Sequence, residues 1–192
     1  IKDCTIDLMK YQSLLIMGAS GVGKSTLLRT LAGLWPYAKG NVYLPKEEEF
    51  LFLPQRPYLP LGSLRQAISY PVVEEVISEK YSDEEIKEIL IACKLENLAD
   101  KLDIVDDWSR ILSLGEQQRI AFARILLYRP EFVFLDEATS ALDEDLEGNL
   151  YDMLKFHLPN TKIISIAHRS SLIAKHQAIL RLKEKGCWEI HE

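Results

Sequence analysis

The chain has 192 residues, of which 47% are hydrophobic and 27% charged, and its formal net charge is −6. This composition is typical of a globular domain with a sizeable core, and the acidic balance disfavours a nucleic-acid partner. The cysteines Cys4, Cys93 and Cys187 are far apart and form no Cys-x-x-Cys pair. Their spacing favours a reducing compartment over a disulfide framework or a zinc site.

The sequence shows no candidate transmembrane or signal segment. No apolar run approaches the roughly 20 residues that cross a bilayer. Lys2 and Asp3 stand where the features of a signal peptide would begin. The chain begins with Ile1 instead of a methionine and soon enters a strand-like run. We therefore expect this sequence to be an excerpt from a longer protein.

The first part of the chain alternates apolar strands with a helix. "SLLIM" (13–17) is a short apolar run that ends in glycines, which predicts a buried strand. Leucines at helical spacing predict a helix over 25–34. "FLFLPQ" (50–55) predicts a second strand, which Pro54 closes.

A mainly helical pattern follows. Ser82 and Glu85 have the Ser-x-x-Glu spacing of a capping box, and the apolar residues after them fall on one helical face. A further helix is predicted over about 114–128, ending before Pro130. We expect about 62–128 to form an α-helical subdomain inserted in a layered core.

Two mostly apolar runs follow the helical part. "FVFLD" (132–136) and "TKIISIAH" (161–168) are typical of parallel strands that are buried on both faces. Strands that alternate with helices predict an α/β fold with a mostly parallel sheet flanked by helices. Residues 1–192 would form a single domain of this class.

The stretch "GASGVGKST" (18–26) satisfies the Gly-x-x-x-x-Gly-Lys-Ser pattern of a phosphate loop (P-loop). Glycines let such a loop wrap a phosphate with backbone N–H groups pointing inward, while the lysine faces the β- and γ-phosphates and the serine hydroxyl faces Mg²⁺. A chance match arises on the order of once per hundred chains of this length. The predicted nucleotide-binding residues are Gly18, Ala19, Ser20, Gly21, Val22, Gly23, Lys24, Ser25 and Thr26.

Asp136 and Glu137 end an apolar strand, where open α/β sheets place their ligands. Phosphoryl transfer needs one carboxylate for Mg²⁺ and a second group that positions or deprotonates the attacking water. Adjacent residues on a strand point to opposite sides, so this pair can divide the two roles. An isolated Asp-Glu pair would more simply be a loop start or a helix cap. Beside a phosphate loop we favour the functional interpretation.

The residues from Ser113 to Glu116 have two interpretations. Their spacing is that of a capping box, which alone is a complete structural explanation. A helix N-terminus with a serine hydroxyl and a neighbouring glycine, here Gly115, is also an anion site that can meet a γ-phosphate.

The order of the phosphate loop, Gln55, "LSLGEQQR" (112–119), "FLDEATSALD" (134–143) and His168 resembles the ATP-binding-cassette (ABC) ATPase domain, from about residue 8 to the end. The resemblance implies a P-loop NTPase core with an inserted helical subdomain, ATP and Mg²⁺ as cofactors, and head-to-tail pairing with a second ABC ATPase domain. The signature residues, which would close over the partner's nucleotide, are Ser113, Leu114, Gly115 and Glu116.

The resemblance also implies a role for each remaining motif residue. Gln55 would contact Mg²⁺ and the attacking water and sense a transmembrane partner, while Asp136 would bind Mg²⁺. Glu137 would be the general base, and His168 would contact the γ-phosphate. Asp143 would lie at the dimer interface. The implied metal set is Ser25, Gln55 and Asp136.

The sequence departs from the family pattern at two signature positions. The usual signature is Leu-Ser-Gly-Gly-Gln, whereas this chain has Leu114 in place of the first glycine and Glu116 in place of the glutamine. Glu116 would bring negative charge near the partner's phosphates unless it turns back to cap Ser113. The aromatic residue that normally stacks on adenine would lie upstream of this chain.

Three longer stretches, 53–71, 106–124 and 164–176, resemble ABC subfamily D and related bacterial peptide- and cobalamin-uptake transporters. Those proteins are half-transporters whose membrane domain lies on the same chain, and subfamily D carries fatty acids or their CoA esters. The resemblance implies a site at the cytosolic face of a membrane: the plasma membrane in a bacterium, or a peroxisome or plastid in a eukaryote. Exposed Tyr58 and Leu59 would suit a groove for a coupling helix of the membrane domain.

Two alternatives belong to other classes of ABC protein. A soluble ABC ATPase that acts on ribosomes or DNA usually carries two cassettes with a basic linker, or a long coiled coil, and this acidic chain shows neither. A regulator that binds ATP without turnover is disfavoured by the presence of both Glu137 and His168.

Overall fold

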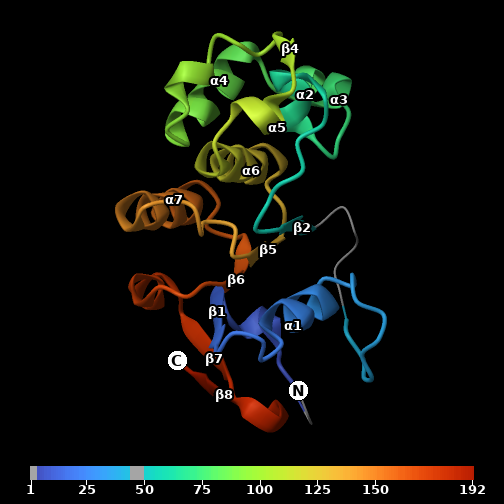
Figure 1. Ribbon diagram of the computed structural model, residues 1–192, viewed down its shortest axis with the longest axis vertical. Coiled ribbons are helices and arrows are strands. Elements are labelled where there is room, and N and C mark those ends of the chain that lie inside the picture. Colours follow the sequence, from blue (N-terminus) through green and yellow to red (C-terminus); the bar gives the residue numbers. More distant parts are fainter. Residues whose placement is uncertain (1–3, 44–49) are drawn as a thin grey trace. The chain divides into compact units, whose positions relative to one another are not determined.

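The computed structural model describes residues 4–43 and 50–192, which divide into two compact units. The first unit comprises the residues up to Pro54 together with 130–137 and 160–192, and the second comprises 55–129 and 138–159. Figure 1 shows that the first contains the main sheet and the second most of the helices. Each unit is described below by itself.

The first unit contains a six-stranded sheet with the strand order β2-β5-β6-β1-β7-β8 (Figure 1). Neighbouring strands are parallel except β7 and β8, which are antiparallel. Because the carboxyl ends of parallel strands meet at one edge, the segments that follow β1, β5 and β6 lie along the same edge. The strands are β1 (Ser13–Gly18), β2 (Phe50–Leu53), β5 (Phe132–Asp136), β6 (Lys162–Ile166), β7 (Ala178–Leu182) and β8 (Trp188–His191).

The core of the first unit forms around the central strands, whose apolar runs allow burial on both faces. Every residue of β5 is buried, and Leu14 of β1 pairs with Ile164 of β6 inside the main hydrophobic cluster. Helix α1 (Lys24–Leu31) contributes Leu28, which is fully buried in the same cluster. The strands predicted over 13–17 and within 161–168 are therefore confirmed.

Helix α1 ends three residues before the predicted boundary at residue 34. Leu34 continues the helical spacing, but its side chain is 54% exposed and adds nothing to the core. Gly33 adopts a φ of 72°, a left-handed conformation that ends helices. Among its described residues, the unit also contains the short 3-10 helices η1 (Leu8–Lys10), η4 (Ser170–Lys175) and η5 (Glu184–Gly186).

The second unit is organised around α6 (Leu114–Tyr128), on which α2, α4 and α7 pack. Ten of the 15 residues of α6 are buried, so this helix is the centre of the unit. Its remaining elements are α2 (Leu64–Ser69), α3 (Glu74–Lys80), α4 (Asp83–Ala92), η3 (Glu96–Leu98), α5 (Trp108–Ile111), α7 (Glu144–His157) and the two-stranded sheet of β3 (Gly62–Ser63) and β4 (Val105–Asp106).

The helix predicted over 114–128 and the capping box of Ser82 and Glu85 are confirmed. Helix α7 was not predicted; it begins where the Asp143 carboxylate accepts a hydrogen bond from the Leu146 amide at 2.8 Å. Strands β7 and β8, which complete one side of the first unit's sheet, were not predicted either.

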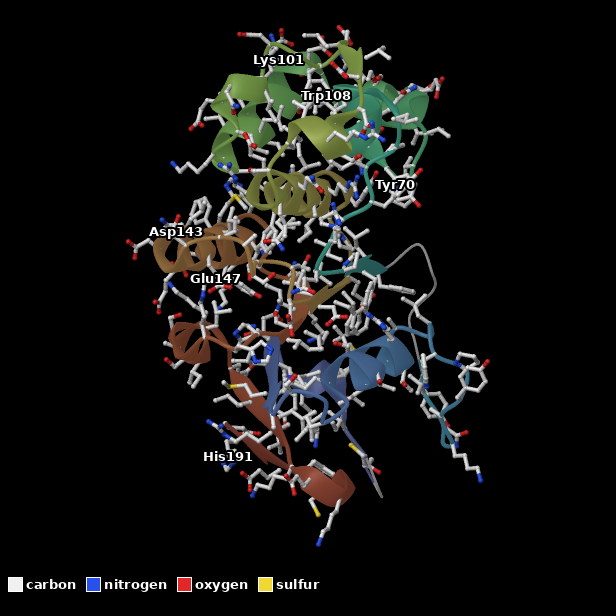
Figure 2. All side chains as sticks on the ribbon, viewed as in Figure 1. Tyr70, Lys101, Trp108, Asp143, Glu147 and His191 are labelled. Atoms are coloured by element: carbon white, nitrogen blue, oxygen red, sulfur yellow. The ribbon has the colours of Figure 1, made fainter. Side chains whose placement is uncertain are left out.

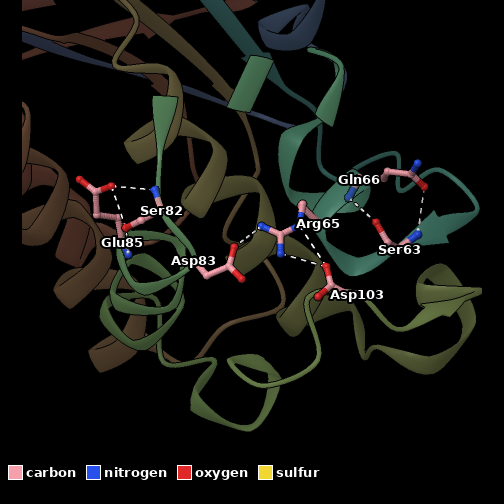
Figure 3. Close-up of polar contacts among 7 residues, drawn as sticks. All are labelled: Ser63, Arg65, Gln66, Ser82, Asp83, Glu85 and Asp103. Atoms are coloured by element: carbon pink, nitrogen blue, oxygen red, sulfur yellow. Dashed lines mark hydrogen bonds and ion pairs between the residues drawn. The ribbon is translucent and has the colours of Figure 1, made fainter. Parts of the chain in front are cut away.

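Arg65 ties together separate segments of the second unit, as Figure 3 shows. Its guanidinium is 8% exposed and donates to Asp83 at 2.7 Å and to Asp103 at 2.9 Å. These contacts join the start of α2, the start of α4 and the loop before β4. Because Arg65 donates to the Asp83 carboxylate, the pKa of Asp83 lies below its usual value.

Candidate nucleotide-binding and catalytic site

The phosphate loop lies between β1 and α1 and depends on its glycines. A Cβ atom at Gly18, whose φ is 152°, would lie 2.6 Å from the Leu182 carbonyl oxygen. Gly23 precedes α1 with a φ of 102°, a conformation that other residues rarely adopt. The buried ammonium of Lys24 donates to the carbonyl oxygens of Gly18 at 3.0 Å and Ala19 at 3.1 Å. The loop thus curves around its lysine.

Ser25 and Asp136 come together at the same edge of the sheet. The Ser25 hydroxyl donates to Asp136 Oδ1 at 2.7 Å, and Asp136 is only 4% exposed. A hydroxyl and a carboxylate are the hard oxygen ligands that Mg²⁺ prefers, so the donor set fits this ion. Among residues 4–43 and 50–192, no cluster of three His, Cys, Asp or Glu side chains could hold a metal. Mg²⁺ is usually held by one or two protein oxygen ligands together with nucleotide phosphates and water.

Arg29 is a member of this site that the sequence analysis missed. Its guanidinium Nη2 donates to Asp136 Oδ2 at 3.2 Å, while the other carboxylate oxygen accepts from Ser25. Arg29 lies four residues after Ser25, which places both on one face of α1. That spacing was visible in the sequence, but the long-range contact with Asp136 was not.

Glu137 and His168 form a second pair beside the first. Glu137 Oε1 lies 2.8 Å from His168 Nε2, and the Glu137 amide donates to the Ile166 carbonyl oxygen at 3.1 Å. The prediction that Asp136 and Glu137 diverge as neighbours on one strand was wrong in its detail, because β5 ends at Asp136. Glu137 has a φ of 53°, and a left-handed conformation at a residue other than glycine costs about 1–3 kcal/mol and occurs often at active sites.

The second unit contains the remaining predicted site residues: Gln55, the signature residues and Asp143. The buried side chain of Gln118, on α6, holds the segment around Gln55 in place. Gln118 is fully buried and its Nε2 donates to the Gln55 carbonyl oxygen at 2.8 Å and to Ser140 Oγ at 3.3 Å. Its Oε1 accepts from the Ala141 amide at 3.0 Å. Gln118 therefore links the glutamine segment to the segment before Asp143. The only sequence signal for this role was a polar residue within a buried helix.

The signature residues form the N-terminus of α6. Ser113 Oγ accepts from the Glu116 amide at 3.3 Å, and the Glu116 carboxylate accepts from the Ser113 amide at 3.0 Å. The capping box is thus confirmed, and Glu116 turns back toward Ser113. Leu114 is 39% exposed, whereas a Cβ atom at Gly115 would lie 3.3 Å from the Leu142 side chain and 3.4 Å from the Ala141 carbonyl oxygen.

Asp143 caps α7 and its side chain lies at the surface of the second unit, as labelled in Figure 2. The capping bond to Leu146 is a structural role. The exposed position is also compatible with an interface role, which remains a prediction.

The prediction that Tyr58 and Leu59, before α2, are both exposed is correct only for Tyr58. Tyr58 is 59% exposed, but Leu59 is 6% exposed and belongs to the core of the second unit. Leu61, which is 75% exposed, takes the outward position. Beneath this surface, Arg124 of α6 donates to the Tyr58 carbonyl oxygen at 2.8 Å, and burial lowers the pKa of Arg124 to about 10.

None of the helices described within 4–43 and 50–192 combines the length and the apolar character that a bilayer span requires.

Comparisons with known proteins agree with this geometry. A family model described as "ABC transporter" matches residues 1–140. An uncharacterized ABC transporter ATP-binding protein of Haemophilus influenzae is 50% identical over 99% of this chain and 31% of its own length. ABC transporter D family member 1 of Arabidopsis thaliana is 37% identical over 100% of this chain and 15% of its own length.

Further relatives include a lysosomal cobalamin transporter of Homo sapiens, which is 40% identical over 99% of this chain and 32% of its own length. Among solved structures, a bacterial Atm1-family ABC exporter with ATP bound superposes with a TM-score of 0.79. It is 26% identical, and the match covers 94% of this chain and 34% of that one. The chain thus spans about a third or less of the relatives it matches.

The family match covers most of the chain, and the sheet order, phosphate loop and carboxylate positions are those of a P-loop fold. The chain belongs to the ABC transporter family, as one of its ATP-binding domains.

Proposed function

We propose that this chain binds ATP with Mg²⁺, pairs head to tail with a second ABC ATPase domain and hydrolyses ATP to drive transport through a membrane domain. The observation that carries the proposal is the pairing of Ser25 with Asp136 and of Glu137 with His168 beside one phosphate loop. This arrangement supplies a metal-binding pair and a candidate base for water at a single sheet edge.

The residues of the first unit would divide the chemistry among them. Lys24, whose ammonium is held by two loop carbonyl oxygens, would bind the β- and γ-phosphates. Ser25 and Asp136 would hold Mg²⁺, which when bound would neutralise phosphate charge. Glu137 would accept a proton from the attacking water, and His168 would orient its carboxylate through the 2.8 Å contact. The resemblance further assigns His168 a contact with the γ-phosphate.

Head-to-tail pairing is supported by the surface position of the signature residues. Ser113 and Leu114 are exposed at the N-terminus of α6, where backbone N–H groups and the helix dipole favour an anion. A partner's γ-phosphate would meet Ser113 and Gly115 there, with Asp143 at the same interface. Gln55 would complete the metal site and report on the membrane domain.

The resemblance and the relatives support a proposal for the membrane partner and the cargo. We propose a transmembrane domain on the same full-length protein, with the ATPase at the cytosolic face of a membrane. Exposed Tyr58 and Leu61 would meet that domain. The resemblance to subfamily D, to which some of the relatives belong, implies fatty acids or acyl-CoA as cargo. Transport assays on the full-length protein with labelled acyl-CoA and with a peptide would separate these cargo classes.

Mixing two inactive variants tests the composite site directly. Lys24→Ala should inactivate a chain's own phosphate loop, and Ser113→Ala should inactivate the signature that it offers to a partner. A mixed dimer then contains one site with an intact loop from one chain and an intact signature from the other. Equal mixing should restore roughly a quarter of the parent ATPase rate, because half the dimers are mixed and each has one good site of two.

Two variants that stay inactive when mixed, while each still folds, would show that the sites are not shared between chains. Lys24→Ala mixed with Lys24→Ala/Ser113→Ala is the matched control, since no intact site can form in that mixture.

A further inference from the structure

The carboxylate of Glu116 occupies the donors that the proposed function assigns to a partner's γ-phosphate. Its Oε2 accepts from the Ser113 hydroxyl at 2.8 Å and from the Ser113 amide at 3.0 Å. The Asn97 side-chain amide donates to Oε1 at 3.5 Å. Glu116 is therefore held against the N-terminus of α6 by groups from two segments of the second unit.

The hydroxyl of Ser113 has one proton to give. In this structure the proton goes to Glu116, and an ionised phosphate oxygen, which can only accept, would need the same proton. A carboxylate at a helix N-terminus also occupies the end of the helix dipole that attracts anions, and it repels a second negative group. A phosphate that approaches Ser113 must therefore compete with Glu116 for the Ser113 hydroxyl and for the positive end of the α6 helix dipole.

Glu116 is ionised in this setting. Partial burial opposes its charge, but the hydrogen bonds from Ser113 and Asn97 and the nearby Arg119 outweigh that effect, so the pKa of Glu116 lies below its usual value. The competing group at the signature is thus an anion.

Two other helices of the same unit provide internal references, which Figure 3 shows. In α4 the Glu85 carboxylate accepts from the Ser82 amide at 2.8 Å and the Ser82 hydroxyl at 3.0 Å, which reproduces the Glu116 arrangement. In α2 the Gln66 side chain accepts from the Ser63 amide at 3.0 Å. A glutamine at this position therefore preserves the capping bond to the serine backbone.

We propose that Glu116 is a positioning residue that competes with the γ-phosphate for Ser113 and so raises the ATP concentration needed to close the dimer. The proposal rests on the proposed function, since it concerns the signature of one chain meeting the nucleotide of another. Glu116→Gln keeps the cap and removes the charge, so it should favour closure.

ATP titration of dimer formation tests the proposal. In a Glu137→Gln background, which slows hydrolysis, light scattering measures the dimer fraction against ATP concentration. Adding Glu116→Gln should lower the midpoint about 5-fold, the effect of one charge at a helix N-terminus. Glu85→Gln is the matched control, because it removes the same charge from an equivalent box, and its midpoint should equal that of the parent.

A second measurement separates competition from general stability. Glu116→Gln and Glu85→Gln should change the thermal midpoint by similar amounts, while only Glu116→Gln shifts the ATP midpoint. In a Ser113→Ala background the shift caused by Glu116→Gln should be smaller, since the hydroxyl is no longer contested.

The outcomes distinguish the two proposals. An ATP midpoint that Glu116→Gln leaves unchanged, or equal midpoint shifts for Glu116→Gln and Glu85→Gln, would overturn the role of Glu116 and leave the proposed function standing. No ATP-dependent dimer in any variant would overturn both.

Discussion

The two units present their proposed functional groups in opposite ways. In the first unit Lys24 and Asp136 are 6% and 4% exposed, and each is held by hydrogen bonds from its own unit. In the second unit Ser113 and Asp143 are exposed, and both cap helices. Buried charges need compensation where they lie, whereas exposed caps keep a surface that a second molecule can contact. This difference is consistent with the proposal that the first unit binds the phosphates and the second unit contacts another chain.

The largest effect should come from removing the cation of the first unit. Lys24→Ala should weaken ATP binding at least about 100-fold and leave no measurable turnover, because it deletes the charge that faces the phosphates. Calorimetric ATP titration and phosphate release measure the two quantities. Lys101→Ala removes an exposed lysine of the second unit and should leave both unchanged. Normal hydrolysis by Lys24→Ala would refute the phosphate-loop assignment.

The proposed base should have the next largest effect. Glu137→Gln should keep ATP binding and lower the hydrolysis rate by about 10²–10⁴, or about 3–5 kcal/mol of barrier. Single-turnover hydrolysis separates this chemical step from product release. Glu144→Gln, on the exposed first turn of α7, is the control and should turn over normally. An active Glu137→Gln enzyme would place the base elsewhere.

The two glutamate capping boxes sharpen the comparison inside the second unit. Ser113→Ala and Ser82→Ala each remove a cap and should each lower the free energy of unfolding by about 1 kcal/mol. Only Ser113→Ala should also reduce turnover, by roughly 10-fold or more, since only Ser113 is proposed to bind a phosphate. Denaturant unfolding and steady-state hydrolysis give the two readouts. Equal turnover in the two variants would show that Ser113 only caps its helix and does not bind a phosphate.

The smallest effect should come from Arg65, which stabilises the second unit without entering the chemistry. The pKa of Asp83 is lowered by Arg65, so the stabilisation is present above the carboxyl's unfolded pKa and is lost as the pH falls through its folded pKa. Arg65→Met should lower Tm by about 2–4 °C near pH 7 and flatten the acid limb of the Tm–pH profile. If the Tm–pH profile of Arg65→Met ran parallel to that of the parent, the ion pair between Arg65 and Asp83 would not be the cause of the pH dependence.

The parts of the site that were predicted from the sequence carry local signals. The phosphate loop and the Ser113 box are encoded by consecutive residues, so their geometry follows from short-range rules. Arg29 and Gln118 were missed because their contacts join distant parts of the sequence. Arg29 contacts Asp136, 107 residues away, and Gln118 contacts Gln55, 63 residues away. Leu59 was misassigned because a proline-rich loop has no period that tells inward from outward.

Two predicted boundaries of secondary-structure elements were wrong for related reasons. The helix over 25–34 was predicted too long because Leu34 continues the spacing without having a core to face. Glu137 was placed on its strand, although the backbone turns left-handed at that residue. Such a turn is imposed by tertiary contacts, here including the bond to the Ile166 carbonyl oxygen, and no local sequence pattern predicts it.

The central claim is a composite ATPase, and Mg²⁺-dependent ATP hydrolysis measured across protein concentration tests it most directly. We predict a specific activity that rises with concentration and that is at least about 100-fold lower in the Glu137→Gln control at every concentration. A specific activity that is constant from dilute to concentrated protein, and abolished by Glu137→Gln, would mean that one chain holds a complete site and would contradict the account.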